Sequence, residues 1–455
     1  MKKEIRPLFI IFLMLTLILV ISCKSQSPEI ASPEKITSEN TVNPAQKSSE
    51  TAQQSLPQLG DLCTGQEECV TLCHDNKGRC TQYCEEHPEN ELCGVVFPFK
   101  INVAPSSLCQ GTNIIFDHAP VNLEETELLL PLGLMTGGHV TPVDHHYFQN
   151  FANLKDDIEV YSPGDGVITE IQHMGGAPPG KDYRIVIQHT CTISSIFIHI
   201  QVLAEKLAAQ APEDYSGVKI PVKAGEIIGW YKNNVDYNVV DSELTLPGFI
   251  IPLHYDGEPW KIHVPNTYDY YNEPVKSKLL AKSVRTIEPR AGKIDYDIDG
   301  RLVGNWFAEV VGSWFAEGND GYSGDGSKGS EYYKAHLSFA YDFMDPSLII
   351  VSIGDYDGKP VQYAVKGNAP DPAKIDIRSG IVKYELVSWG YTTDTGEEWD
   401  KTKLAKVVKA TAGTHIDGVV LVQILEDRKI KFETFPGKTA GQVNGFTEKA
   451  RIYGR

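Results

Sequence analysis

Five short segments between residues 137 and 230 decide the fold of this chain: GGHVTPVDHHYF (137–148), VYSPGDGVITEI (160–171), YRIVIQHT (183–190), SSIFIHIQVL (194–203) and VKAGEIIGW (222–230). Each segment is short, carries branched or aromatic residues and is bounded by turn residues, which is typical of strands. The cluster 163–166, Pro-Gly-Asp-Gly, predicts a tight turn before Val167 and Ile168. We therefore predict an antiparallel sheet whose neighbouring strands could bring histidines and acids together.

These segments resemble the lysostaphin-type zinc metallopeptidases, which cut peptidoglycan cross-bridges. The resemblance covers about residues 130–245 and is most specific at 162–168, 197–200 and 222–229. It implies a small twisted antiparallel sheet and a zinc ion. In that family a histidine, an aspartate four residues later and the second histidine of a His-x-His pair hold the zinc. Another histidine helps to activate the zinc-bound water.

Transferred to this sequence, the family's pattern is matched in part. Asp144 matches the aspartate ligand, but His139 precedes it by five residues rather than four, and His145 and His146 follow it directly. His199 matches the catalytic histidine. The resemblance therefore implies a general base at His199 and a zinc ligand at Asp144, with the first histidine ligand left open.

The His-x-His pair is missing. Asp236 and Asn238 stand about where it should fall, and their alternation would point both side chains to one face of a strand. A carboxylate and an amide make a poorer zinc site than imidazoles do. We favour a non-catalytic domain that binds a glycan, a peptide or a protein. The alternative is an active zinc endopeptidase or amidase acting on cell-wall peptides, with a third ligand still to be found.

Chain length and charge limit the number of domains and the kinds of partner. A chain of 455 residues is too long for one ordinary core, which predicts two or three domains. The 42 basic and 60 acidic residues give a formal net charge of −18. Because binding to phosphate backbones depends on clustered lysine and arginine, we expect no nucleic-acid partner.

The first 23 residues read as an export signal. Lys2, Lys3 and Arg6 precede a short apolar run, and 20–23, Val-Ile-Ser-Cys, looks like a prokaryotic lipobox. We expect lipidation of Cys23, with an uncleaved signal anchor as the alternative, so that the chain is attached to a membrane on its extracytoplasmic side. Residues 24–59 are rich in Ser, Thr, Gln, Pro, Glu and Lys, which predicts a disordered tether.

Residues 60–94 form a cysteine-rich module. Six cysteines lie within 31 residues, and two Cys-x-x-x-Cys pairs place their thiols on one face of a helical turn, which predicts a disulfide-bonded helical hairpin. The predicted pairs are Cys69 with Cys84, Cys73 with Cys80 and Cys63 with Cys93. A zinc site is the alternative, although an exported compartment favours disulfides.

The other two cysteines, Cys109 and Cys191, could form a disulfide that ties the lead-in of the central domain to its sheet. We therefore place the sheet domain at residues 95–289. Within it, residues 202–212 are predicted to form a helix, because Val202, Leu203 and Leu207 lie on one face.

Residues 290–455 form a separate domain of strands with almost no helix, either a closed barrel or a sandwich. Gly304-Asn305-Trp306 at the start of a strand resembles the Gly-x-Trp of lipocalin barrels. A barrel that carried a small ligand would need an open apolar cavity. In sum, the sequence predicts a mainly β, multidomain, exported envelope protein, with zinc as its possible cofactor.

Overall fold

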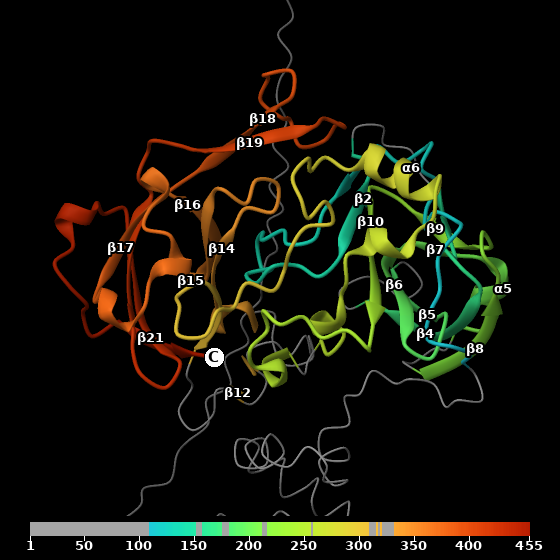
Figure 1. Ribbon diagram of the computed structural model, residues 1–455, viewed down its shortest axis with the longest axis horizontal. Coiled ribbons are helices and arrows are strands. Elements are labelled where there is room, and N and C mark those ends of the chain that lie inside the picture. Colours follow the sequence, from blue (N-terminus) through green and yellow to red (C-terminus); the bar gives the residue numbers. More distant parts are fainter. Residues whose placement is uncertain are drawn as a thin grey trace, which may run out of the picture. The chain divides into compact units, whose positions relative to one another are not determined.

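The computed structural model describes residues 109–151, 157–174, 182–211, 216–255, 258–308, 315–316, 319–320 and 332–455 (Figure 1). The predicted signal peptide, tether and cysteine-rich hairpin lie outside these residues, with Cys23 and the six cysteines Cys63, Cys69, Cys73, Cys80, Cys84 and Cys93. The described residues all belong to one compact unit, Pro57–Arg455. They are mainly β, as predicted.

The central region contains a seven-stranded antiparallel sheet. Its order is β1 (Leu128–Leu130), β2 (His146–Gln149), β10 (Asn234–Asp241), β6 (Ile193–Ile200), β5 (Tyr183–Gln188), β4 (Gly166–His173) and β8 (Ser216–Val222). A three-stranded sheet of β3 (Ile158–Tyr161), β9 (Ile227–Tyr231) and β7 (Val202–Leu203) completes it. The five segments that predicted the sheet supply β2, β3, β4, β5, β6, β7 and β9. The strand prediction is therefore confirmed.

The predicted helix at 202–212 is wrong over its first residues. Val202 and Leu203 form β7 and pair with Trp230 and Gly229 of β9, and the helix α5 covers only Glu205–Ala208. Leu203 and Leu207 are both buried, as a helix would also have buried them. The apolar spacing was therefore compatible with either structure, and pairing with β9 decided between them.

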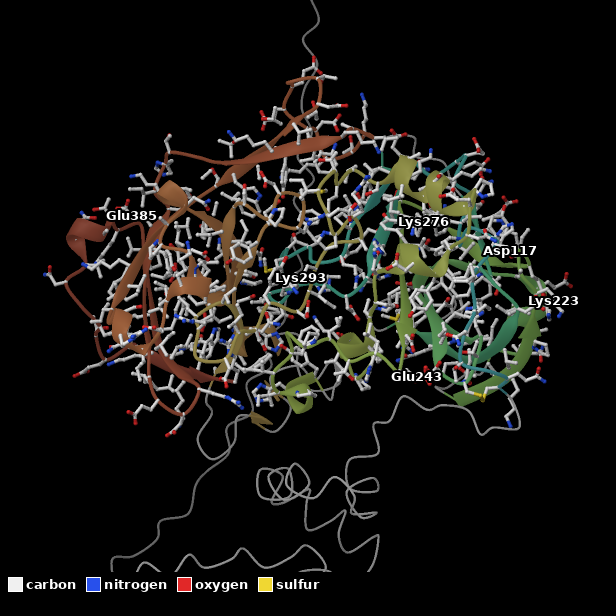
Figure 2. The ribbon with its side chains drawn as sticks, in the orientation of Figure 1. Asp117, Lys223, Glu243, Lys276, Lys293 and Glu385 are labelled. Carbon is white, nitrogen blue, oxygen red and sulfur yellow. A yellow bond between two sulfur atoms is a disulfide. The ribbon has the colours of Figure 1, made fainter. Side chains whose placement is uncertain are left out.

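The predicted disulfide joins Cys109 and Cys191, which are 82 residues apart in sequence (Figure 2, yellow bond). Next to it, the Cys191 amide donates to the carbonyl of Gly111 (2.9 Å) and the Thr192 hydroxyl donates to the carbonyl of Thr112 (3.0 Å). The lead-in to the domain is thus fixed to the turn between β5 and β6. Charged side chains such as Lys223 lie at the surface, where Lys223 pairs with Asp165 (2.6 Å).

The C-terminal strands close into an eight-stranded barrel (orange and red in Figure 1). Its order is β11 (Gly304–Ala308), β14 (His336–Tyr341), β15 (Ile349–Tyr356), β16 (Lys359–Val365), β17 (Val382–Val387), β20 (Gly418–Ile424), β21 (Lys429–Pro436) and β22 (Arg451–Gly454). Strand β22 closes the barrel by pairing with β11. In this pairing Phe307 lies opposite Gly454, and Ala308 lies opposite Tyr453. Of the two predicted architectures, the barrel is therefore the one observed.

Aromatic side chains fill the barrel interior. Phe339 lies 6.0 Å from Tyr384 and 6.1 Å from Phe432, and Phe432 lies 5.7 Å from Tyr453, measured between ring centroids. All four rings belong to one buried cluster. An eight-stranded barrel is narrow enough for its own side chains to fill it, and this one does so.

A second apolar cluster connects the sheet to the barrel. Leu128, Leu130 and Tyr147, on β1 and β2, are buried in the same cluster as Phe343 and Ile350. A backbone hydrogen bond also joins the two regions, since the amide of Val407 donates to the carbonyl of Val284 (2.9 Å). The sheet and the barrel therefore share part of their core.

The remaining elements are short. Two-stranded ribbons are formed by β12 (Phe315–Ala316) with β13 (Asn319–Asp320) and by β18 (Trp389–Thr393) with β19 (Val407–Ala412). The helix α6 spans Val275–Lys282, and the 3-10 helices are η1 (Pro252–Tyr255), η2 (Lys261–His263), η3 (Thr267–Tyr270), η4 (Tyr332–Ala335), η5 (Lys366–Asn368), η6 (Pro372–Lys374), η7 (Ile377–Ser379) and η8 (Ala440–Gln442). Among the described residues, none of these helices has the length and apolarity needed to span a bilayer.

Candidate functional site

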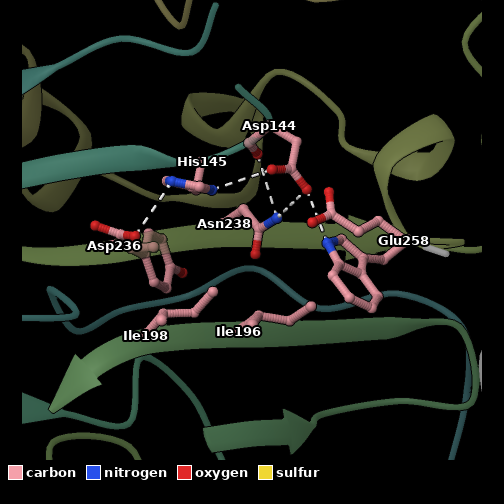
Figure 3. A pocket seen from close by; sticks show the side chains of 9 residues that line it. Asp144, His145, Ile196, Ile198, Asp236, Asn238 and Glu258 are labelled. Atoms are coloured by element: carbon pink, nitrogen blue, oxygen red, sulfur yellow. Dashed lines mark hydrogen bonds and ion pairs between the residues drawn. The ribbon is translucent and has the colours of Figure 1, made fainter. Parts of the chain in front are cut away.

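The predicted site residues meet over neighbouring strands of the large sheet (Figure 3). Asp144 and His145 precede β2, and Asp236 and Asn238 lie on the adjacent strand β10. Asp236 and Asn238 both line the same small pocket, as their alternation predicted. The pocket has a volume of about 30 Å³, enough for one or two water molecules, and is lined by Asp144, His145, Ile196, Ile198, Asp236, Tyr237, Asn238, Glu258 and Trp260.

Asp144 is buried and both of its carboxylate oxygens are engaged. Oδ1 lies 3.0 Å from Nδ1 of His145, and Oδ2 accepts from the indole Nε1 of Trp260 (2.8 Å) and from the side-chain amide of Asn238 (3.4 Å). Burial alone would raise the pKa of Asp144. The hydrogen bond and the charge of His145 outweigh it and lower this pKa to about 2. Asp144 is thus an ionised carboxylate whose partners are all protein groups.

His145 lies between two carboxylates. Its Nδ1 faces Asp144 and its Nε2 lies 3.2 Å from Oδ2 of Asp236 and 3.1 Å from the hydroxyl of Tyr147. Burial lowers the pKa of His145, but Asp236 and Asp144 together outweigh burial and raise it. A protonated imidazole has two N–H donors, one for each carboxylate. When His145 is protonated, it supplies the positive charge between Asp144 and Asp236.

His199 lies at a β-bulge in strand β6. Tyr183 pairs with Ile200 and Arg184 pairs with Ile198, so that His199 is the extra residue of β6. Its φ of 72° lies in the left-handed region, which is costly for a residue other than glycine and is most often found at functional sites. The bulge leaves the His199 side chain 39% exposed.

Two acids hold the imidazole of His199. Nδ1 lies 2.8 Å from Oδ2 of Asp182, and Nε2 lies 3.6 Å from Oδ2 of Asp236. The hydrogen bond to Asp182 is the main cause of the raised pKa of His199. By contrast, burial raises the pKa of Asp236, although His145 and His199 act against it. Asp236 therefore bridges the buried imidazole and the exposed one.

The other two candidate histidines lie apart from this chain of contacts. His146 is on the opposite side of β2, where its Nδ1 donates to the carbonyl of Leu130 (3.0 Å). The ring of His139 lies 6.1 Å from that of His145, and burial lowers the pKa of His139 to about 4. Of His139, His145 and His146, only His145 is thus in direct contact with Asp144.

We tested this arrangement against the chemistry of a zinc site. In the part of the chain that the structure describes, no group of three His, Cys, Asp or Glu side chains could hold a metal ion. A histidine ligand must present a nitrogen lone pair to zinc, but both nitrogens of His145 face carboxylates. Asn238 presents a donor to Asp144 where the family has a histidine ligand. The residues present do not fit a zinc ion in this arrangement.

Three residues of the site were missed by the sequence analysis, namely Glu258, Trp260 and Lys261. They lie in a Pro-rich stretch that follows the sheet, and no local pattern marks it as part of the pocket. Trp260 donates to Asp144, and Lys261 is fully buried, with Nζ 3.3 Å from the hydroxyl of Thr141. Only the long-range fold brings these side chains to Asp144.

Comparisons with known proteins give matches among solved structures only. No protein-family model and no curated protein matches the chain. Among solved structures, the chain is similar to one titled "Crystal structure of a zinc containing peptidase from vibrio cholerae", with 19% sequence identity and a TM-score of 0.20. The match covers 28% of this chain and 39% of that chain. The function proposed below therefore rests on the geometry of the site.

Proposed function

We propose that the pocket over β6 and β10 is a non-catalytic recognition site for a glycan, a peptide or a protein of the cell envelope. The observation that carries this proposal is the engagement of Asp144, whose two oxygens accept protein donors while His145 supplies the neighbouring positive charge. A buried carboxylate satisfied in this way is stable without a metal ion.

The rim of the pocket provides the groups that a ligand would contact. The His199 side chain, which contacts Asp236 of the pocket lining, is 39% exposed, and Trp260 in that lining is partly exposed. The guanidinium of Arg184 stacks over the Trp260 ring at 4.7 Å and pairs with Glu170 at 2.7 Å. An aromatic face that is held in place and bordered by charged groups suits a polar ligand with some apolar surface.

The place of action follows from the predicted export signal. Lipidation of Cys23 would attach the chain to a membrane and expose the sheet to the extracytoplasmic side. The partner would then be a component of the envelope. This part of the proposal depends on the sequence, since Cys23 lies outside the described residues.

The competing hypothesis is a zinc endopeptidase or amidase that acts on cell-wall peptides. It requires His145 to lose its proton, Asn238 to turn its amide away from Asp144, and a third ligand to approach. The carrier hypothesis for the barrel requires interior space, which the packed rings of Phe339, Tyr384 and Phe432 occupy.

The test uses the full chain, exported so that its disulfides form. Zinc is measured by elemental analysis, and binding is measured by co-sedimentation with purified peptidoglycan sacculi and with intact envelope fractions. Release of soluble amino groups is followed with and without EDTA. We expect no stoichiometric zinc, and binding to an envelope fraction without release.

A variant separates recognition from stability. His199→Asn retains a residue that tolerates the left-handed region but removes the imidazole. We expect about 10-fold weaker envelope binding, whereas the matched control His415→Asn, at an exposed histidine of the barrel, leaves binding unchanged. Stoichiometric zinc together with EDTA-sensitive release of amino groups would establish the hydrolase instead.

A further inference from the structure

The two ends of the barrel differ in how they are closed. Near the start of β11, the Arg455 guanidinium lies 4.1 Å above the Trp306 ring and pairs with Asp297 at 3.2 Å. Arg455 and Asp297 are almost fully buried, with 1% and 3% of their side chains exposed. Because Ala308 pairs with Tyr453 of β22, Arg451 at the start of that strand lies beyond the opposite end of β11.

At that opposite end the barrel opens into a pocket of about 240 Å³. It is lined by Asp355, Asp357, Phe432, Glu433, Thr434, Pro436, Lys449, Arg451 and Tyr453. The rings of Phe432 and Tyr453 belong to the buried core, so they form its apolar floor. Barrel mouths are among the usual places for small-molecule sites. The volume is below the usual range for drug-sized ligands, which points to a ligand about the size of a single amino acid or sugar.

Charges of both signs surround this floor. Arg451 and Lys449 come from β22 and the segment before it, and Asp355 and Asp357 come from β15 and the turn after it. Asp355 holds Arg451 in place, since its Oδ2 lies 2.7 Å from the guanidinium while its Oδ1 accepts from the amide of Gly358 (3.0 Å). The carboxylate of Glu433 accepts from the amide (2.6 Å) and the hydroxyl of Thr447.

Two of these charges are available to a ligand. Within the described residues, neither Asp357 nor the ammonium of Lys449 has an ion-pair partner, and both residues are exposed. The pocket thus offers a fixed guanidinium and an ammonium next to a carboxylate. A ligand of a single charge would meet a repelling group as well as an attracting one, whereas a ligand with both charges matches the two together.

From this juxtaposition we infer that the barrel mouth binds a small zwitterion, a free α-amino acid. Its carboxylate pairs with the guanidinium of Arg451 and with Lys449, because arginine binds carboxylates through two parallel N–H donors. Its ammonium group pairs with Asp357. Its side chain lies on the rings of Phe432 and Tyr453. This site is distinct from the sheet pocket and does not depend on the function proposed there.

The experiment measures thermal unfolding of the full exported chain with each of the common L-α-amino acids at about 10 mM. For a dissociation constant of about 1 mM, we expect at least one of them to raise Tm by roughly 2–4 °C. Titration calorimetry then gives its affinity. The N-acetyl amide of the same amino acid, which lacks both charges, should give no shift.

A matched pair of variants tests the pocket itself. Asp357 and Asp427 are both exposed, both left-handed, with φ of 54° and 57°, and both in turns between consecutive barrel strands. Asparagine tolerates that conformation, so neither Asp357→Asn nor Asp427→Asn should disturb the fold. We expect Asp357→Asn to weaken binding about 5- to 10-fold and Asp427→Asn to leave it unchanged. Arg451→Gln should weaken it at least as much as Asp357→Asn.

Three results would overturn the inference: no shift with any amino acid, equal affinity for the N-acetyl amide, or equal loss of affinity in both aspartate variants. Stabilisation by a neutral monosaccharide in place of amino acids would also overturn it. None of these results bears on the sheet pocket, because the His199→Asn variant is read with envelope fractions and not with amino acids.

Discussion

The sheet pocket and the barrel mouth are both lined by acids and bases, but they satisfy their charges in opposite ways. In the sheet pocket the charged groups are buried around a space of about 30 Å³, and Asp144 and His145 are partnered by protein groups. At the barrel mouth the space is about 240 Å³, and Asp357 and Lys449 face solvent. A buried charge must be satisfied inside the protein, whereas an exposed charge can exchange water for a ligand. Strong internal pairing therefore fixes the buried groups of the sheet pocket and leaves its rim for recognition, whereas the exposed charges at the barrel mouth can bind a ligand directly.

Among the tests of this contrast, the variant Asp144→Asn has the largest expected effect. Removing the charge leaves His145 with one carboxylate instead of two, and because asparagine keeps only one acceptor oxygen, either His145 or the indole of Trp260 loses its acceptor. We expect the free energy of unfolding to fall by about 3–5 kcal/mol, measured by urea unfolding of the full chain. A variant as stable as the wild type would show that the Asp144 carboxylate is dispensable to its neighbours and would reopen the zinc hypothesis.

The second test compares Arg451, at the start of β22, with Arg455, which directly follows that strand. Arg455 and Asp297 are 3.2 Å apart and buried, whereas Arg451 and Asp355 are 2.7 Å apart with 54% and 17% of their side chains exposed. Burial raises the pKa of Asp297 to about 6 even beside Arg455. We expect Arg455→Gln to cost about 3 kcal/mol and Arg451→Gln less than about 1 kcal/mol, in the same unfolding assay. A larger cost for Arg451→Gln, which breaks the closer pair, would mean that distance, and not burial, sets the strength of these pairs.

The third test is the loss of stability at low pH. His336 on β14 is buried against Phe307, with ring centroids 5.4 Å apart, and burial, with the charge of Lys261, lowers its pKa from 6.5 to about 3. As pH falls from 6.5 toward 3, the unfolded chain binds a proton that the folded chain does not, so stability is lost over this window. His336→Asn should remove about 2 kcal/mol of the loss between pH 7 and pH 5. The exposed control His415→Asn should remove none, and identical slopes for both variants would contradict the assignment.

The smallest effect is expected at the barrel mouth. Asp357→Asn and Asp427→Asn should each change the free energy of unfolding by less than about 0.5 kcal/mol, because both side chains are exposed. Calorimetric melting measures this directly. A clear loss for Asp357→Asn alone would show that Asp357 stabilises the barrel and would weaken its assignment to a ligand.

Local patterns predicted the strands well and the site in part. The turn cluster before Val167 and the alternation of Asp236 with Asn238 are properties of short segments, and both are found as expected. The opposite faces of His145 and His146 follow from the same alternation. What could not be predicted depends on distant segments, such as Trp260 against Asp144, which are 116 residues apart.

Competing local structures were the other source of error. Residues 202–208 had the apolar spacing of a helix, but β9 offered Val202 and Leu203 partners for a strand. Barrel closure likewise depends on the register between β11 and β22, since nothing within either strand distinguishes a barrel from a sandwich.

The apolar cluster that joins the sheet to the barrel limits how this chain can be cut or recombined. Leu128 and Leu130 from one side, and Ile350 from the other, would become solvent-exposed in any fragment that ended between the two halves. A fusion protein that contained either half alone would expose this apolar surface and would tend to aggregate. The sheet and the barrel must therefore be expressed together for either pocket to be studied in a soluble protein.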